Sequence, residues 1–400
     1  MNMMAEESQV RPGTHDAPAV EPAPDVESAP VAVPRPIRVA WLAGPETFSR
    51  IGRILQPLAV GLMDELIGVS IFLPERSDER ELPTLPIDVI RFGRLGWRIF
   101  RARTVAHLAA EVMRRQIGLL HALDASAVEQ ARRLANATGL DYVVSCYSLL
   151  DAEILGPLDG HLAAVLPAGE AIAKTLRDQR VAPSERIHLV RPGVYQVSRP
   201  TCFPDSTKSI AVVAGGQMDD FTAYEVLLTT FNELRLRNFD CQFFIIANGR
   251  AETQVRAAAE RMGLNPRLTF IDRQPALQLQ GILKSADLYI SPVASPQVDV
   301  GALLAMAAGD PVLAPADGAD DFLVDGKTVV RFRPGDSGDL TRKLIGVLED
   351  RERTATIANG ALDHLREHHS PAGMVRRVAA IYRQAVEARE QAAMQARRSS

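Results

Sequence analysis

Short apolar runs alternate with amphipathic stretches from residue 37 to the end of the chain. In the first half, the runs typical of buried strands lie at residues 37–42, 69–73, 87–90, 118–121, 142–145 and 162–165. Residues between them, such as 127–138, show the 3.6-residue period of a helix. Strands that alternate with helices form parallel sheets covered by helices on both faces. The pattern therefore predicts a Rossmann-like domain over residues 37–195.

The same alternation restarts after a proline-containing loop. Its second series of apolar runs lies at residues 209–213, 242–247, 268–271, 287–291, 311–314 and 329–332. This restart predicts a second Rossmann-like domain over residues 205–372, so the expected α/β fold has two such domains facing one another. The amphipathic residues 373–396 predict a C-terminal helix that crosses back to the first domain. Ligands of such sheets bind at the carboxyl ends of the strands, where we expect the functional loops.

Composition and charge narrow the class of protein. The 400 residues include 45 Lys and Arg against 49 Asp and Glu, and this net charge of −4 argues against a nucleic-acid partner. Residues 1–36 contain seven of the 26 prolines and few large apolar side chains, so we expect an acidic disordered tail. The three cysteines are far apart, and no apolar run approaches the roughly 20 residues of a membrane span. We expect a cytoplasmic protein, and a peripheral position at the inner face of a membrane stays open.

Three segments of the C-terminal half resemble one known family. They are residues 286–292 (ADLYISP), 305–314 (AMAAGDPVLA) and 324–328 (VDGKT). In order and spacing they are similar to the family-4 retaining glycosyltransferases, whose B-type fold has two Rossmann-like domains. The stretch from His121 to Asp124 and residues 187–194 resemble that family's N-terminal and interdomain segments. The resemblance implies a hexosyl-type transferase that moves a sugar from a nucleotide diphosphate to a glycan or lipid acceptor, in polysaccharide or glycolipid biosynthesis.

The resemblance also places the donor site, where this sequence departs from the family. The donor loop runs through Gly215, Gly216, Gln217 and Thr222, with Gln217 and Thr222 at the positions of the family's diphosphate-binding Arg and Lys. Gln297 and Leu304 replace the family's two glutamates, and Asp299 lies between them. Tyr147 replaces the N-terminal His that faces the donor sugar. The catalytic residue is therefore unassigned. Two functions stay open: a glycosyltransferase with an atypical donor site, or a catalytically inactive binding or scaffold protein.

Charged residues near the expected strand ends are candidates for the missing cations. Arg250 follows a predicted strand of the second domain and can reach a phosphate. In the first domain, Arg50 and Arg53 lie where a helix opens after the first strand, a position that suits an anion.

The acidic loops of the second domain point to a metal ion. With Arg250 set against Glu252, six acids stay uncompensated: Asp219, Asp220, Asp299, Asp317, Asp320 and Asp321. A phosphate beside them would need a divalent cation, for which Asp219 and Asp220 are candidate ligands, although the resemblance itself requires no cofactor. The alternative is that these acids are solvated loop residues and that Asp299 caps a helix.

An arginine-rich segment occupies residues 91–115. Arg91, Arg94, Arg98 and Arg101 repeat at intervals of 3, 4 and 3, and on a helix they would form a cationic stripe suited to anionic lipid headgroups. Glycines at 93 and 96 weaken a helix by about 1 kcal/mol each. We therefore expect a solvated connection here, with membrane contact as the alternative.

Overall fold

The computed structural model describes residues 36–77, 82, 87–93, 98–158, 160–200, 202–203, 209–272, 276–318 and 320–399. The expected tail, apart from Pro36, and the expected contact of Arg94 lie outside these residues, and for Arg98 and Arg101 only the backbone is described. Residues 36–400 form one compact unit.

The first sheet has, among the described residues, six parallel strands in the order β3-β2-β1-β4-β5-β6. They are β1 (Ile37–Leu42), β2 (Ile67–Pro74), β3 (Asp88–Phe92), β4 (Leu119–Ala122), β5 (Tyr142–Cys146) and β6 (Leu162–Pro167). The helices are α1 (Thr47–Asp64), α2 (Arg98–Arg114), α3 (Val128–Thr138), α4 (Leu149–Ile154) and α5 (Glu170–Asp178), with short 3-10 turns at Ala125–Ala127 and Ser184–Arg186. All five residues of β5 are buried, as expected for a strand covered on both faces.

The second sheet repeats this order in its own strands. Its six described strands are parallel and run β12-β11-β10-β7-β8-β9. They are β7 (Ile210–Gln217), β8 (Cys241–Asn248), β9 (Leu268–Ile271), β10 (Leu288–Ile290), β11 (Val312–Pro315) and β12 (Val330–Phe332). The helices are α6 (Phe221–Leu236), α7 (Glu252–Arg261), α8 (Ala276–Leu283), α9 (Val300–Ala308), α10 (Ser337–Glu349) and α11 (Arg351–His368). Both predicted Rossmann-like sheets are thus confirmed, while the domain boundaries drawn at 195, 205 and 372 stay predictions.

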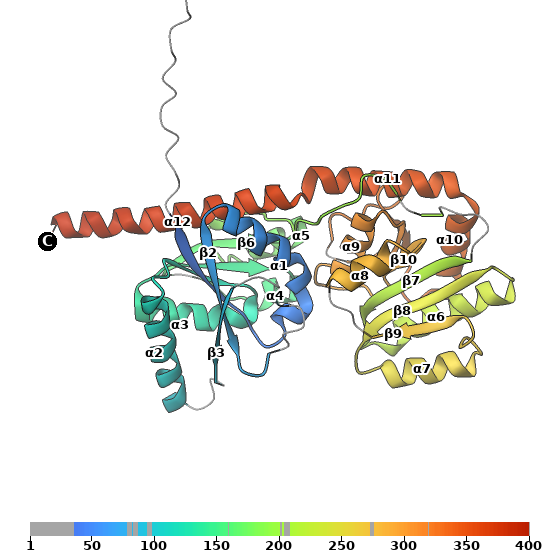
Figure 1. Ribbon diagram of the computed structural model, residues 1–400, viewed down its shortest axis with the longest axis horizontal. Helices are drawn as coiled ribbons and strands as arrows, with labels where there is room; N and C mark the ends of the chain where they lie inside the picture. The colour runs from blue at the N-terminus through green and yellow to red at the C-terminus, as the bar shows by residue number, and fades with distance from the viewer. Residues whose placement is uncertain are drawn as a thin grey trace, which may run out of the picture. The chain divides into compact units, whose positions relative to one another are not determined.

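The last helix, α12 (Pro371–Ser399), leaves the second sheet and packs on the first (Figure 1). A Cβ at Gly61 of α1 would lie 2.4 Å from Val375 Cγ2, so the glycine lets the two helices approach closely. Arg383 donates from Nη2 to Glu65 Oε2 at 2.9 Å. The predicted crossing helix is confirmed.

The arginine-rich segment corrects one expectation. We expected an irregular connection, but residues 98–114 form helix α2. Gly93 precedes this helix, so its helix-weakening cost does not apply, and Leu108 and Val112 bury one face at the i, i+4 spacing. None of the helices in the described part of the chain is both long and apolar enough to cross a membrane. Contact of this segment with a membrane surface stays a prediction.

Candidate functional site

The carboxyl end of β7, rather than a loop after it, carries the predicted donor residues from Gly215 to Gln217, and it packs closely against β10. A Cβ at Gly215 would lie 2.7 Å from Tyr289 Oη, and this hydroxyl donates to Gly215 O at 2.9 Å. Residue 215 therefore has to be glycine, because a side chain there would displace the tyrosine that supports the end of β7. Gly216 and Gln217 follow as exposed residues at the carboxyl end of the strand, which is where a ligand of this sheet would lie.

Asp219 joins the loops that follow β7 and β8. It accepts hydrogen bonds from Gln217 Nε2 at 2.7 Å and from the main-chain N–H of Arg250 at 2.9 Å, and Arg250 Nε lies 3.5 Å away. These partners, the Arg250 amide first, lower the pKa of Asp219. The Arg250 side chain is otherwise 87% exposed. The structure thus brings the predicted site residues Gln217, Asp219 and Arg250 together, and the negative charge of Asp219 partly compensates the positive charge of Arg250.

Asp220 and Thr222 are hydrogen-bonded to each other at the start of helix α6. Asp220 Oδ1 accepts from Thr222 N at 2.9 Å and so caps the N-terminus of α6. Among the described residues, no group of three or more His, Cys, Asp or Glu side chains is arranged to hold a metal ion. The metal site considered at Asp219 and Asp220 stays an untested alternative, and both carboxylates already accept from main-chain amides.

Asp299 caps helix α9, as one of the two interpretations expected. Its Oδ1 accepts from Ala302 N at 2.9 Å and its Oδ2 from Ser291 Oγ at 2.5 Å. Its own N–H donates to Asp320 Oδ2 at 3.0 Å. Burial raises the pKa of Asp299 and raises that of Asp320 well above its ordinary value. Leu304, further along α9, is buried in the core.

A short antiparallel bridge connects two predicted site positions. Ser148 pairs with Gln297, flanked by hydrogen bonds from Leu149 N to Pro296 O at 2.7 Å and from Val298 N to Tyr147 O at 2.9 Å. The segment after β5 of the first sheet is therefore joined to the segment before α9 of the second. Tyr147 and Gln297, 150 residues apart in the chain, meet at this bridge.

Arg50 and Arg53 lie on the first turns of α1, which begins at Thr47. Arg50 Nη2 lies 2.9 Å from Asp124 Oδ2, and Thr47 Oγ1 donates to the same oxygen. The charge of Arg50 is thus compensated inside the first half. Arg53 lies close enough to Tyr289 of β10 for its charge to oppose the burial that raises the pKa of that phenol.

The expected excess of six acidic charges is wrong. Arg250 approaches Asp219, whereas Glu252 pairs with Arg256 at 2.9 Å. Asp321 pairs with Arg191 at 2.7 Å, and burial raises the pKa of Asp320 well above its ordinary value, which favours its neutral form. The expected excess was obtained by adding charges along the sequence. In the folded chain, burial and partners distant in sequence decide which carboxylates keep an uncompensated charge.

Two arginines at the strand ends were not singled out from the sequence. Arg191 lies within 3.6 Å of Glu170 Oε1 as well as pairing with Asp321. Arg331 donates from Nε at 3.0 Å and Nη2 at 2.6 Å to Leu323 O, and from Nη1 to Pro315 O. Its guanidinium therefore holds the loop after β11. No local sequence signal marks either pairing, because the partners lie 8 to 130 residues away.

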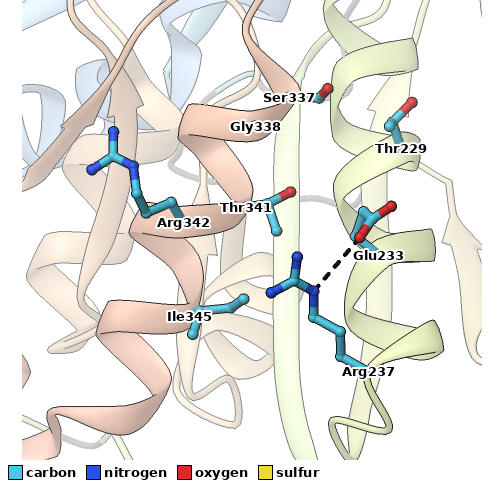
Figure 2. Close-up of a pocket in the computed structure, with 8 residues that line it drawn as sticks. All are labelled: Thr229, Glu233, Arg237, Ser337, Gly338, Thr341, Arg342 and Ile345. Atoms are coloured by element: carbon cyan, nitrogen blue, oxygen red, sulfur yellow. Dashed lines mark ion pairs between the residues drawn. The ribbon is translucent and has the colours of Figure 1, made fainter.

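A surface pocket lies between α6 and α10 (Figure 2). It is lined by Thr229, Glu233, Arg237, Ser337, Gly338, Thr341, Arg342 and Ile345. Arg237 lies 3.6 Å from Glu233, and Arg342 pairs with Asp339. Thr229 is eight residues beyond Phe221, the first residue of α6, which is about 12 Å along the helix. This pocket is therefore separate from the strand-end loops.

Comparison with known proteins identifies the second half most clearly. Residues 209–350 match the family model described as "Glycosyl transferases group 1". The D-inositol 3-phosphate glycosyltransferase of Corynebacterium aurimucosum is 27% identical over 199 residues, which is 47% of this chain and 47% of that protein. The chain thus spans about half the length of the curated relatives it matches.

Solved structures resemble the chain over most of its length. Sucrose-phosphate synthase from Thermosynechococcus elongatus has a TM-score of 0.71 at 16% identity, covering 88% of this chain and all of that one. Anabaena HepE in complex with UDP and glucose has a TM-score of 0.68 at 15% identity, covering 86% of this chain and 98% of that one. The chain therefore carries a group 1 glycosyl transferase domain at residues 209–350 and has the B-type glycosyltransferase fold.

Proposed function

We propose that this chain is a family-4-like glycosyltransferase with an atypical donor site, which moves a hexosyl group from a nucleotide diphosphate sugar to a glycan or lipid acceptor. The observation that carries the proposal is the group 1 domain, in which Tyr289 supports the carboxyl end of β7 at Gly215, Gly216 and Gln217. Arg250 lies beside this strand end through Asp219, and the charge of Arg53 acts on the pKa of Tyr289 from the first half. These two guanidinium groups are the proposed substitutes for the family's Arg and Lys at the diphosphate, where charge grows as the glycosidic bond breaks.

A second candidate is a catalytically inactive protein of the same fold. Two observations favour it: Asp219 engages Gln217 and the Arg250 amide, and the Ser148–Gln297 bridge joins the two donor-facing segments. A sugar placed between Tyr147 and Gln297 would have to part this bridge.

A thermal-shift panel separates the two candidates. UDP, GDP and ADP sugars are added with and without Mg²⁺, and transfer is assayed on glycan, lipid and inositol phosphate acceptors. A donor at 100 times its Kd stabilises the native state by about 2.7 kcal/mol, which raises Tm. Arg250→Ala should weaken this shift, whereas Arg261→Ala, an exposed cation at the far end of α7, should not. No shift with any donor, together with no transfer, would replace the first candidate by the second.

A disulfide across the bridge tests whether the two segments must separate. The flanking hydrogen bonds make Ser148 and Gln297 a non-hydrogen-bonded antiparallel pair, in which Cα atoms lie about 4.5 Å apart, within disulfide range. Ser148→Cys with Gln297→Cys, in a Cys146→Ala background, should oxidise readily. If the chain binds a donor between these segments, oxidation should abolish the thermal shift and reductant should restore it. An unchanged shift in the locked chain would place the donor elsewhere.

A further inference from the structure

The pocket between α6 and α10 carries hydrogen-bonding groups that the proposed function does not use. Its volume is about 540 Å³, within the range of about 300 to 1,000 Å³ that is typical of small-molecule sites. Figure 2 shows Arg237 of α6 and Thr341 of α10 directed into the space between the two helices, with Ile345 beside them. The pocket is therefore a second place, apart from the strand ends, where a ligand would find polar partners.

Two buried threonines decide what the hydroxyl of Thr341 can offer a ligand. Thr341 is 6% exposed, and its partner Thr230 is fully buried. Thr230 Oγ1 lies 3.3 Å from the main-chain oxygen of Ser337, and Thr341 Oγ1 lies 3.3 Å from Thr230 Oγ1. Because a carbonyl oxygen can only accept, Thr230 donates to Ser337 and Thr341 donates to Thr230. The single hydroxyl proton of Thr341 is thus used inside the protein, and toward a ligand this oxygen acts as an acceptor.

Glu233 and Arg237, one turn apart on α6, supply an acceptor and a donor. Arg237 Nε lies 3.6 Å from Glu233 Oε2, which is longer than a hydrogen bond. The two side chains are 57% and 44% exposed, Arg237 being the more exposed. The carboxylate can therefore still accept hydrogen bonds from a ligand, and the guanidinium can still donate them.

The charges around the pocket compensate one another. Glu233 lies opposite Arg237, and Arg342 pairs with the buried carboxylate of Asp339. An anion would gain from Arg237 but would also meet the charge of Glu233 and the lone pairs of Thr341. A hydroxyl group both donates and accepts, so a neutral ligand with several neighbouring hydroxyls matches all three groups.

We propose that the pocket between α6 and α10 is a second ligand site, which binds a neutral polyhydroxy compound: a sugar unit of a glycan, or a cyclitol. Its hydroxyls donate to Thr341 Oγ1 and to the Glu233 carboxylate, one of its oxygens accepts from Arg237, and Ile345 contacts its C–H face. The inference goes beyond the proposed function and does not depend on it. Because the pocket is separate from the end of β7, it can be filled with or without a nucleotide sugar at the strand ends.

Methyl NMR tests where such a ligand binds. Glucose, maltotriose and myo-inositol are titrated into the chain with labelled isoleucine methyl groups, with and without UDP. The Ile345 methyl signal should shift and saturate, whereas that of Ile246, which pairs with Gly215 in the sheet, should not move. Tighter binding of maltotriose than of glucose would identify a glycan, and tighter binding of myo-inositol a cyclitol. No saturable shift at Ile345 with any of these probes, or a shift at Ile246 alone, would overturn the proposal.

Variants of the lining test the assigned hydrogen bonds. Thr341→Val keeps the shape but removes the acceptor, and Glu233→Ala removes the carboxylate, so each should weaken binding about three- to tenfold. Thr341→Ser keeps the hydroxyl and should bind as the unaltered chain does. Glu225→Ala, which removes an exposed acid of α6 outside the lining, should also change nothing.

The surface variant Glu233→Ala decides the outcome even if Thr341→Val does not fold. Unchanged sugar binding in Glu233→Ala would overturn the assignment of its carboxylate. An anion site would show the opposite sign, because removal of this negative charge would strengthen the binding of inorganic phosphate. Phosphate binding of that kind at Ile345, without sugar binding, would replace the polyhydroxy ligand by an anion.

Discussion

The two sheets share one strand order, yet their polar residues at the strand ends are held in different ways. In the first half, Asp124 and His121 connect inward, to buried side chains of neighbouring strands and helices. In the second half, Asp220 and Asp299 accept from main-chain amides of the helices that they cap, and Asp219 accepts from a main-chain amide of the loop after β8. The comparison teaches that one fold can support its candidate site either by a buried network or by loop caps. The first arrangement costs more to break.

Asp124→Ala should have the largest effect, because it breaks the buried network of the first half. Asp124 is 2% exposed and accepts from Thr47, Arg50 and Ser126. Loss of one partner of a buried pair costs about 3 to 5 kcal/mol, and partial exposure of Arg50 reduces the expected loss to about 2 to 3 kcal/mol. Urea unfolding measures this loss. Glu129→Ala, which removes an exposed pair with Arg133 on α3, should cost under about 0.5 kcal/mol. Equal effects of the two variants would contradict the comparison.

Gly215→Ala should destabilise the second half by about 2 kcal/mol. The added Cβ would clash with Tyr289 Oη and break the hydrogen bond from this hydroxyl to the carboxyl end of β7. The matched control is Gly346→Ala in α10, where a Cβ meets no described atom within 4 Å. That change should stabilise the helix by about 0.5 to 1 kcal/mol. Thermal unfolding should show a lower stability for Gly215→Ala and a higher stability for Gly346→Ala. An unchanged stability in Gly215→Ala would mean that the end of β7 can move away from Tyr289.

Asp320→Asn should change how stability depends on pH. The pKa of Asp320 is raised well above its ordinary value, by burial first and the Asp299 charge second, so the native state keeps a proton that the unfolded chain releases above about pH 4. The free energy of unfolding should therefore fall as pH rises above about 4, by up to about 1.4 kcal/mol per pH unit, until Asp320 ionises in the folded chain. Asp320→Asn should lose this slope above about pH 4, whereas Asp317→Asn should retain it. Parallel pH curves for the Asp320 variant and the unaltered chain would refute the prediction.

Asp321→Ala should have the smallest effect, about 1 kcal/mol. Its carboxylate accepts from Glu170 N at 3.2 Å, at the start of a helix whose own cap residue, Gly169, has no side chain, and from Arg191 at 2.7 Å. Lys174→Ala on the exposed side of α5 removes only a surface pair and should cost less. Chemical unfolding distinguishes the two, and equal losses would show that the cap from Asp321 adds nothing.

The sequence alone determined the secondary structure and the fold class. Each of the twelve predicted strands overlaps a strand among the described residues, because buried parallel strands are continuous apolar runs that can be read locally. The cap at Asp299 was also readable, since a carboxylate three residues before an N–H of the first turn is a local signal. Helix α2 was missed because Gly93, which counted against a helix, precedes it.

Only the tertiary structure decided which polar side chains meet. Asp219 finds Arg250 across 31 residues, Arg191 finds Asp321 across 130, and His121 finds Tyr382 across 261. No periodicity encodes these pairs, because they depend on which loops and helices the two sheets bring to the same edge. Burial then decides which of the paired groups keeps its charge or its proton. For that reason the residues of the candidate site were recognisable in the sequence, but their partners and their charges were not.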